Sequence, residues 1–414
     1  MILEIRLSNF FSIKNEIVLD MRAGNSNTQK TQALRANTFT YKDEQILKSV
    51  AVYGANASGK SNIIKAIRFC CAMVFSSHNN NENTTFNFSP FKFEGYPHKP
   101  SRFFIRFVAG EIEYEYSFSL TRNEIITEEL YYYPNGRRAK IFTRDETLGK
   151  EKGDIYSFGS VIRKPLDVAE NTSRKTLYIS RASQMDRDIA KDIFRFFQQK
   201  IVFKRPLSDL FVVFEFAQSK NLLLKALTIA DSDIVDIKIN SFSRDSDFSF
   251  HDNKTPIQKL SPSDNLPIFT FHKTDPEISF DFAKEESTGT QALFSMMMMI
   301  LYSINNNNIL FIDEIESSLH SKIVEYIVEL FHTSNSAQII YTTHNTNLLN
   351  LNKLRKDQIY FVNKRDDGSS DLYSLFDYKD FRDTMDVEKA YLQGRFDAIP
   401  YIDDSLDNLK TLIQ

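Results

Sequence analysis

The stretch Lys48–Ser61, KSVAVYGANASGKS, decides the fold of this chain. Its beginning, KSVAVY, is a short apolar run typical of a buried strand, and residues 60–75 carry apolar side chains at helical spacing. Between the two, GANASGKS fits the P-loop pattern G-x-x-x-x-G-K-[ST] in the strand–loop–helix setting that the pattern requires. A plain glycine turn is the weaker interpretation, because the chain has only 12 glycines in 414 residues. The stretch predicts a loop that binds a nucleoside triphosphate.

Each part of this loop has a chemical role. Backbone N–H groups of the loop and of the helix start bind phosphate oxygens, and glycine allows the backbone to approach them closely. Lys60 is expected to contact the outer phosphates, and Ser61 is expected to ligate Mg²⁺. The residues expected to bind ATP are Gly54, Asn56, Ala57, Ser58, Gly59, Lys60, Ser61 and Asn62.

A second apolar run, ILFI at 309–312, is followed at once by Asp313 and Glu314. Acidic residues often follow buried strands, so the pair alone carries little weight. After a P-loop, however, Asp313 is expected to hold Mg²⁺, directly or through water, and Glu314 is expected to polarise the attacking water.

Two further motifs can place polar groups near phosphate. His344 follows the apolar run at 338–341, and a histidine at the carboxyl edge of a parallel sheet can reach a terminal phosphate. Ser287-Thr288-Gly289-Thr290 precedes a helix expected over 293–304, so Ser287 is a candidate N-cap and the helix start a candidate anion site. A structural histidine and ordinary helix capping are the alternatives. The methionines at 296–299 are expected to pack in the core.

Composition places the chain among folded proteins, with 42% hydrophobic and 25% charged residues. Its net charge of -3 excludes a general polycation, but residues 160–205 contain eleven Lys or Arg and only five acids. This basic segment is expected to bind nucleic acid or a partner protein, or to be a solvated helix face.

The sequence favours a cytoplasmic protein. No apolar run is long enough to span a membrane, and the N-terminus lacks the basic start and cleavage site of a signal peptide. The only cysteines, Cys70 and Cys71, are neighbours, so no disulfide framework is expected. Alternating residues between 103 and 142 predict an antiparallel meander, with a hairpin about 135–136, whereas a helix is expected over 185–203 and a loop over 240–265. Strands and helices alternate in the last 130 residues, which predicts a parallel sheet.

In this order, the motifs resemble those of the ABC-type ATPase heads of the SMC and RecF class. Ser287-Thr288-Gly289-Thr290 is similar to the signature motif, although it lacks the double glycine of transporters. Asp313 and Glu314 resemble the Walker B motif with its catalytic glutamate, and His344 the switch histidine. Ser317-Ser318-Leu319-His320 falls at the D-loop, and the opening LSNFFS at 7–12 resembles the start of RecF-like chains. No glutamine occurs at 86–93, so the Q-loop role is unassigned.

The whole chain resembles most closely the stand-alone ATPase subunits of bacterial anti-phage defence systems, of the AbiL, RloA and PARIS types. The shared features are PF at 90–91, ESTGT at 286–290, DEIE at 313–316, LH at 319–320 and YLQGRF at 391–396. They extend over residues 1–400, so the resemblance is not limited to the P-loop.

The resemblance implies an α/β fold, namely an ABC-type P-loop ATPase head with a mixed or parallel sheet, an antiparallel β subdomain and a mostly helical insertion. The two halves of the head are expected at 1–145 and 281–414, and the insertion at 146–280. In this class the signature motif contacts the γ-phosphate held by a partner subunit, which implies a homodimer or larger homo-oligomer that uses ATP and Mg²⁺.

Three functions follow from these observations. The first is an ATPase that senses infection and controls a separate effector, a nuclease or another toxin. The second is a RecF-like ATPase of DNA repair or recombination, for which the basic segment would contact DNA. The third is a nucleotide-binding scaffold with little turnover, against which the intact Glu314 counts.

Overall fold

A computed structural model describes residues 1–26, 28–149, 151–204, 216–230, 232–239, 268–382 and 384–400. The chain forms two compact units. The first comprises Met1–Phe203, Ser303–Glu316 and Ile327–Gln414, and the second comprises Lys204–Tyr302 and Ser317–Tyr326. The segment expected as an insertion, 146–280, is therefore shared between the units. The loop expected at 240–265 lies outside the described residues.

The first unit contains the predicted parallel sheet. Its strands have the order β11-β15-β16-β5-β17-β18, and all neighbours are parallel except β17 and β18. The P-loop strand β5 and the strand before Asp313 are buried at every position, as expected for strands covered on both faces. The strands are β5 (Ser49–Gly54), β11 (Ile201–Phe203), β15 (Ile309–Ile312), β16 (Gln338–Thr342), β17 (Ile359–Lys364) and β18 (Ser370–Ser374).

A second, antiparallel sheet confirms the predicted meander and its hairpin. Its order is β10-β9-β8-β7-β6-β1-β2, so the chain runs from neighbour to neighbour except where β1 joins β6. The strands are β1 (Ile2–Ser8), β2 (Ile17–Asp20), β6 (Ser101–Ala109), β7 (Ile112–Leu120), β8 (Ile125–Tyr132), β9 (Ala139–Asp145) and β10 (Tyr156–Phe158). A two-stranded ribbon, β3 (Thr38–Tyr41) and β4 (Glu44–Leu47), precedes β5.

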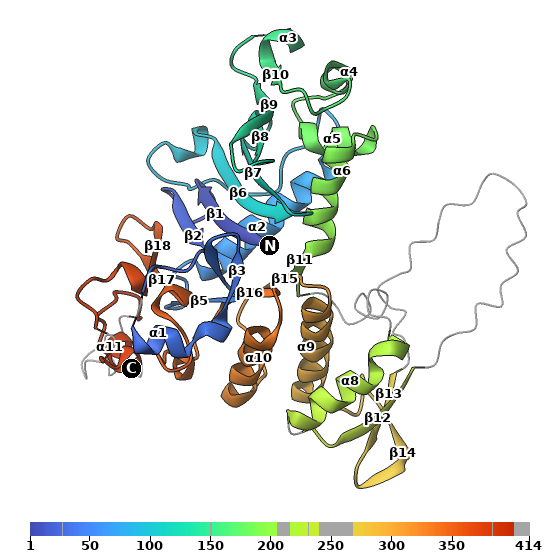
Figure 1. The fold of residues 1–414 in the computed structure, drawn as a ribbon, viewed down its shortest axis with the longest axis vertical. Helices are drawn as coiled ribbons and strands as arrows, with labels where there is room; N and C mark the ends of the chain where they lie inside the picture. The colour runs from blue at the N-terminus through green and yellow to red at the C-terminus, as the bar shows by residue number, and fades with distance from the viewer. Residues whose placement is uncertain are drawn as a thin grey trace, which may run out of the picture. The chain divides into compact units, whose positions relative to one another are not determined.

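The helix α2 (Lys60–Ser76) lies between the two sheets (Figure 1). Ile63 and Ile67 on this helix, Val52 on β5 and Phe103 on β6 belong to one core cluster. Burial of each of these side chains stabilises the fold by about 1.5–3 kcal/mol, so α2 fixes the P-loop to both sheets. Cys70 and Cys71 are buried on α2 as free thiols.

The helices after β9 differ in part from the prediction. They are α3 (Lys152–Ile155), α4 (Pro165–Glu170), α5 (Tyr178–Gln184) and α6 (Asp188–Arg195), followed by a π turn at Phe196–Lys200. The helix expected over 185–203 ends before Ile201, and this part of the prediction is wrong. Ile201 pairs with Ile309 as the first residue of β11, because these apolar residues complete the edge of the parallel sheet.

A buried ion network holds α5 against the antiparallel sheet. The Arg144 guanidinium donates to the carbonyls of Thr176 (2.7 Å) and Ser173 (3.0 Å) and pairs with Glu146. The Glu128 carboxylate, 3.7 Å from the guanidinium, accepts the backbone N–H groups at the start of α5. Burial raises the pKa of Glu128, although Arg144 opposes this effect.

The second unit contains a small antiparallel sheet and the start of a methionine-rich helix. Its elements are α8 (Phe216–Ile229), β12 (Ile234–Ile239), β13 (Ile268–His272), β14 (Asp275–Asp281) and the first part of α9 (Thr288–Asn305). The four methionines at 296–299 are buried, which confirms their predicted core position. The remaining helices are α1 (Gln29–Ala33), α10 (Ser321–Thr333) and α11 (Val387–Leu392). Among the described residues, no helix combines the length and hydrophobicity needed to cross a membrane.

Candidate functional site

The P-loop residues form a tight turn between β5 and α2. Gly59 has φ +108, a left-handed conformation that favours glycine. A Cβ at this position would lie 2.1 Å from Ser370 Oγ and 2.5 Å from Ser12 Oγ, so only glycine fits. Asn56 and Ala57 are exposed at the tip of the loop, ahead of Gly59.

Lys60 is buried at the start of α2, with 5% of its surface exposed. Its Nζ donates to the carbonyls of Gly54 (2.8 Å) and Ala55 (2.9 Å), so the ammonium lies inside the curl of the loop. Burial lowers the pKa of Lys60 to about 8, against the opposing effect of nearby carboxylates that include Asp313 and Glu314. Phosphate groups would favour the charged form, because opposite charges at close range stabilise it.

Ser61 and Asp313, the two predicted Mg²⁺ ligands, lie together although 251 residues separate them in sequence. Ser61 Oγ donates to Asp313 Oδ1 at 3.0 Å. A hydroxyl and a carboxylate are hard oxygen donors, and Mg²⁺ is normally held by one or two such protein groups together with phosphates and water. Ser58 Oγ in the same loop is buried and has no hydrogen-bond partner among the described residues. These residues fit MgATP, in which the metal would neutralise charge on the phosphates.

Thr342 at the end of β16 is a site residue that the sequence analysis missed. Its hydroxyl donates to Asp313 Oδ1 (2.6 Å) and accepts the backbone N–H of Glu314 (2.8 Å). The carbonyl of Thr342 also accepts the N–H of Ile315 at 3.1 Å. Thr342 therefore fixes both acidic residues from the neighbouring strand.

The predicted catalytic Glu314 is exposed and has φ +51, a left-handed conformation uncommon for residues with a side chain. Such strained backbone is found where the surrounding structure fixes it, and functional sites are frequent examples. Here the N–H groups of Glu314 and Ile315 donate to the hydroxyl and the carbonyl of Thr342, and these two bonds supply that constraint.

His344 is exposed two residues after the end of β16, at the carboxyl edge of the sheet. Its backbone N–H donates to Glu316 Oε1 at 2.5 Å, which ties this loop to the residues that follow Asp313. Burial and the nearby Lys60 lower the pKa of His344, so the neutral imidazole is favoured at neutral pH. Glu316 is a second residue whose contact the sequence analysis did not predict.

The opening motif LSNFFS at 7–12 contacts residues next to the P-loop. Ser12 Oγ accepts from Asn62 Nδ2 (2.8 Å) and from Ser370 Oγ (2.7 Å). The Asn9 side chain donates to the carbonyls of Tyr96 and Lys99 and accepts the N–H of residue 91. Asn62, predicted to bind ATP, therefore uses its amide to hold Ser12.

The signature segment (Ser287–Thr290) lies at the start of α9 in the second unit. Ser287 Oγ accepts the N–H of Thr290 at 3.1 Å, which confirms the predicted N-cap. Thr288 is the first residue of the helix, and Ser287 and Thr288 are exposed. A Cβ on Gly289 would lie 3.8 Å from the carbonyl oxygen of Ser318, so the signature segment and the D-loop are neighbours within this unit.

The D-loop residues precede α10. Ser317 and Ser318 are exposed, Leu319 is half-buried, and Ser318 has φ +63. His320 Nδ1 accepts the N–H of Lys322 at 3.2 Å, so this histidine caps the helix.

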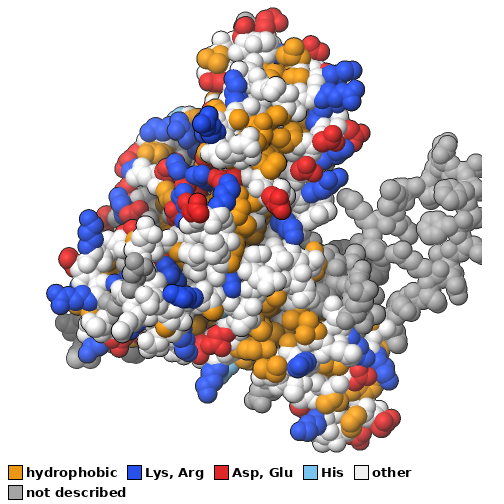
Figure 2. Space-filling model, in the orientation of Figure 1, with side chains coloured by type: hydrophobic (Ala, Val, Ile, Leu, Met, Phe, Trp, Pro, Cys, Tyr) orange, Lys and Arg blue, Asp and Glu red, His pale blue; other side chains and the backbone are white. Residues whose placement is uncertain are grey.

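The basic segment 160–205 is mostly engaged in the fold. Arg174 pairs with Glu124 (2.9 Å) and Glu146 (3.0 Å), Lys175 Nζ donates to a carbonyl of the 76–85 loop, and Arg181 donates to another. Other cations of the segment pair with acids of their own region. On the face drawn in Figure 2, basic and acidic side chains are interspersed.

Within the described part of this segment, Arg163, Lys164 and Lys204 are exposed and make no ion pair. A nucleic-acid contact stays a prediction, and these three residues are the first candidates for it.

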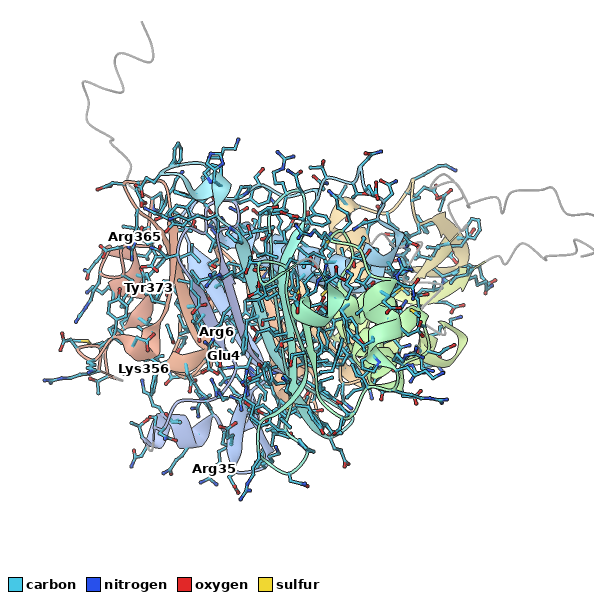
Figure 3. The ribbon with its side chains drawn as sticks, turned by 90° about the horizontal axis from the view of Figure 1, so that it is seen from above. Glu4, Arg6, Arg35, Lys356, Arg365 and Tyr373 are labelled. Carbon is cyan, nitrogen blue, oxygen red and sulfur yellow. The ribbon has the colours of Figure 1, made fainter. Side chains whose placement is uncertain are left out.

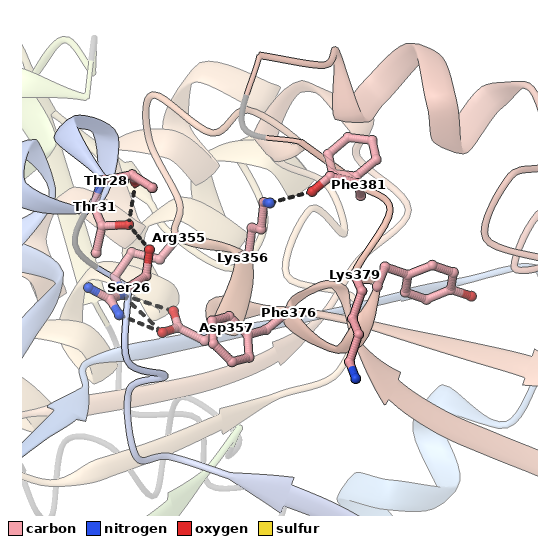
Figure 4. Close-up of a pocket in the computed structure, with 10 residues that line it drawn as sticks. Ser26, Thr28, Thr31, Arg355, Lys356, Asp357, Phe376, Lys379 and Phe381 are labelled. Carbon is pink, nitrogen blue, oxygen red and sulfur yellow. Dashed lines mark hydrogen bonds and ion pairs between the residues drawn. The ribbon is translucent and has the colours of Figure 1, made fainter.

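A separate cavity of about 200 Å³ lies near the start of β17 (Figure 4). Arg355 in its wall forms hydrogen bonds with both oxygens of Asp357, and Lys356 Nζ donates to the carbonyl of Phe381. Figure 3 shows Lys356 on the same side of the first unit as Arg365 and Tyr373. Arg355 and Lys356 thus have structural partners, and the residues that line the cavity include none of those predicted to bind nucleotide.

Comparison with known proteins gives a family. A family described as "AAA domain, putative AbiEii toxin, Type IV TA system" matches residues 49–350. No curated protein matches the chain. Among solved structures, the SMC head domain from Thermotoga maritima has a TM-score of 0.41 at 15% identity, with 90% of this chain and 98% of that chain covered. An SMC head bound to the C-terminal winged-helix domain of ScpA has a TM-score of 0.45 at 16% identity, with 94% and 99% covered.

The family match covers well over half of the chain, and it includes the P-loop, the signature segment, Asp313, Glu314 and His344. The chain therefore belongs to the AAA-domain ATPase family that carries the AbiEii toxin description.

Proposed function

We propose that this protein hydrolyses ATP with Mg²⁺, self-associates through composite nucleotide sites, and controls a separate nuclease or toxin in anti-phage defence. The observation that carries the proposal is the arrangement at the carboxyl edge of the parallel sheet. There Ser61, Asp313 and Thr342 share hydrogen bonds, and Glu314 is held in a strained conformation beside them.

In this proposal, the residues at this edge have separate roles in ATP hydrolysis. The loop N–H groups and Lys60 would hold the phosphates, and Ser61 and Asp313 would hold the metal. Glu314 would orient the attacking water and accept its proton. His344, neutral at physiological pH, would donate a hydrogen bond to the terminal phosphate.

Self-association follows from the signature segment. Its exposed helix start would offer the backbone N–H groups of Thr288 and Gly289 to an anion, while the P-loop belongs to the other compact unit. The resemblance to ABC-type heads supports a head-to-tail pair, in which Lys60 of one chain faces Ser287 and Gly289 of its partner. Such an interface is isologous and closes after two chains.

The role in defence rests on the family description. It names a toxin of a type IV toxin–antitoxin system, which supports a chain that acts in growth arrest or infection control. The effector is expected to be a separate protein, as in the defence ATPases that this chain resembles.

The proposal is tested first by turnover and assembly. Glu314→Gln should bind ATP, lose turnover and accumulate an ATP-dependent dimer, observed by phosphate release and light scattering. Lys60→Ala, purified in the same way, should show neither activity nor assembly. Mg²⁺-dependent turnover in Lys60→Ala would refute the P-loop assignment.

The composite site has its own test. Ser287→Arg should bind nucleotide but fail to assemble and hydrolyse. When Lys60→Ala and Ser287→Arg chains are mixed, a mixed dimer contains one intact site only if the two motifs come from different chains. No recovered activity, despite demonstrated exchange of subunits, would refute the composite arrangement.

A further inference from the structure

Glu286, the residue before the signature segment, is held by side chains of β13. Its carboxylate accepts a hydrogen bond from His272 Nε2 at 2.8 Å and another from the Thr270 hydroxyl. Only 6% of the Glu286 side chain is exposed. A carboxylate this deeply buried needs such donors, because an unpaired buried charge is costly.

His272 connects Glu286 to a second acid. Its Nδ1 lies 2.9 Å from Asp233 Oδ1, and the ring of Phe280 packs edge-on at 4.6 Å. A neutral imidazole has one N–H, whereas both ring nitrogens here face carboxylates. The charged imidazolium is therefore the form that satisfies Asp233 and Glu286 together.

Glu286 in turn sets the start of α9. Ser287, the next residue, caps the helix, and the Gln291 side chain on the first turn donates to the carbonyl of Glu286 at 3.0 Å. Side chains of β13 thus hold the carboxylate of Glu286, and a side chain of α9 holds its backbone carbonyl. We therefore expect a change at the carboxylate to alter the direction in which Ser287 enters the helix.

We propose that His272 is a positioning residue for the signature segment: bridging Asp233 and Glu286 in its charged form, it holds Ser287 and Gly289 ready for the nucleotide of a partner chain. This inference rests on the proposed composite site. The small antiparallel sheet of the second unit would then influence ATP turnover through His272.

The charge on His272 predicts a pH dependence. Burial lowers the pKa of His272, but the bonds to Glu286 and Asp233 outweigh it and raise the pKa above 6.5. The acids that contact the imidazole are Asp233 before β12 and Glu286 before α9, and Asp275 on β14 is the backbone partner of His272 in the antiparallel pairing. Because the pKa is raised in the folded state, the bridge is complete below pH 6.5 and is lost as pH rises through the folded value.

The first experiment measures the pH profile of ATP turnover in the full chain. We expect kcat to fall on the alkaline side as His272 loses its proton. His272→Gln should lose this alkaline decline and turn over about 10-fold more slowly at pH 6.5, with little change in the KM for ATP, because the P-loop is intact. Asp233→Asn, at a position that is 64% exposed, should move the decline to lower pH. His98→Gln, an exposed histidine in the first unit, is the matched control and should leave the profile unchanged.

The second experiment locates the defect by subunit mixing. His272→Gln mixed with Lys60→Ala should recover activity, because one site then combines an intact P-loop with an intact signature segment. His272→Gln mixed with Ser287→Arg should not recover activity, because both chains are defective on the signature side.

The outcomes separate the two proposals. If Lys60→Ala and Ser287→Arg complement each other but Lys60→Ala and His272→Gln do not, the composite site stands and the role of His272 is refuted. An unchanged pH profile in both His272→Gln and Asp233→Asn also refutes it. If no pair recovers activity although the subunits exchange, the composite site is wrong and the inference fails with it.

Discussion

Replacing Thr342 by valine tests how the predicted Mg²⁺ ligand Asp313 and the predicted catalytic Glu314 are held at the carboxyl edge of the parallel sheet. Valine has nearly the same shape as threonine but lacks the hydroxyl, which donates to Asp313 Oδ1 at 2.6 Å and accepts the N–H of Glu314 at 2.8 Å. Thr342 is fully buried, so water cannot easily replace these bonds. The substitution therefore removes two contacts while the packing of β16 is kept.

The effect on Glu314 follows from comparing the free energy of the lost hydrogen bonds with the cost of its left-handed backbone. A hydrogen bond to a charged group contributes about 1.5–3 kcal/mol, and a buried N–H without a partner costs about 1–3 kcal/mol. The left-handed backbone of Glu314 costs about 1–2 kcal/mol, which the bonds of Thr342 offset in the native protein. Without the hydroxyl, only the bond from the Ile315 N–H to the Thr342 carbonyl is left to hold this backbone, and Glu314 is expected to leave its position. A loss of about 2.7 kcal/mol in transition-state stabilisation corresponds to about 100-fold in kcat.

The assay is ATP turnover together with nucleotide binding and thermal unfolding. Thr342→Val should bind ATP with a near-native Kd, because Lys60 and the loop are untouched, and should lose about 100-fold in kcat. Thr342→Ser, which keeps the hydroxyl, should retain most of the turnover. Thr38→Val removes a buried hydroxyl from β3 and controls for a general loss of stability. Folded Thr342→Val with turnover within about 3-fold of the native protein would falsify this reasoning.

Three further predictions concern other parts of the first unit. Gly59→Ala should abolish ATP binding, measured with a fluorescent nucleotide, because the new Cβ would collide with Ser370 and the backbone there is left-handed; normal binding would contradict the loop geometry. Arg144→Met should lower the free energy of unfolding in urea by about 3–5 kcal/mol, since it leaves buried carboxylates without their cation, and a loss under 1 kcal/mol would show that they are neutral. Charge reversal at both Arg163 and Lys164 should change stability by no more than about 0.5 kcal/mol but weaken nucleic-acid binding in a filter assay; equal binding before and after the change would end that prediction.

The sequence predicted those parts of the site whose signals are local. Glycine spacing and the lysine define the P-loop, and four apolar residues before Asp313 define its strand. Because β5, β15 and β16 are parallel, their carboxyl ends meet at one edge, and residues that follow them are brought together. Ser61 and Asp313 were both expected to hold Mg²⁺, and Ser61 Oγ lies 3.0 Å from Asp313 Oδ1.

The sequence could not predict contacts that depend on which strands are neighbours. Thr342 precedes the more conspicuous His344, and nothing in the local pattern shows that its hydroxyl faces Asp313. The only signal was its place at the end of a strand that was already expected to lie in the same sheet. Ser12 is a similar case, since its bonds to Asn62 and Ser370 join three distant segments.

The basic segment shows what a count of charges cannot predict. Residues 160–205 have an excess of cations, but the count does not show that Arg174 pairs with acids at 124 and 146, outside the segment, or that Arg187, Lys191 and Arg195 pair with acids inside it. The helix predicted over 185–203 failed for a related reason. Residues 201–203 are apolar enough for either structure, and the open edge of β15 decided that they form a strand.

The path of the chain gives the short segment Ser303–Glu316 a particular importance. It belongs to the first unit and contains β15, yet the second unit precedes it through α9 and follows it through the D-loop. Two of the four places where the chain passes between the units therefore flank the strand that carries Asp313 and Glu314. The bonds of Thr342 and Glu316 hold Asp313, Glu314 and the loop at His344, whereas Lys60 is held by the carbonyls of Gly54 and Ala55. Loss of the Thr342 hydroxyl is therefore expected to affect turnover far more than nucleotide binding.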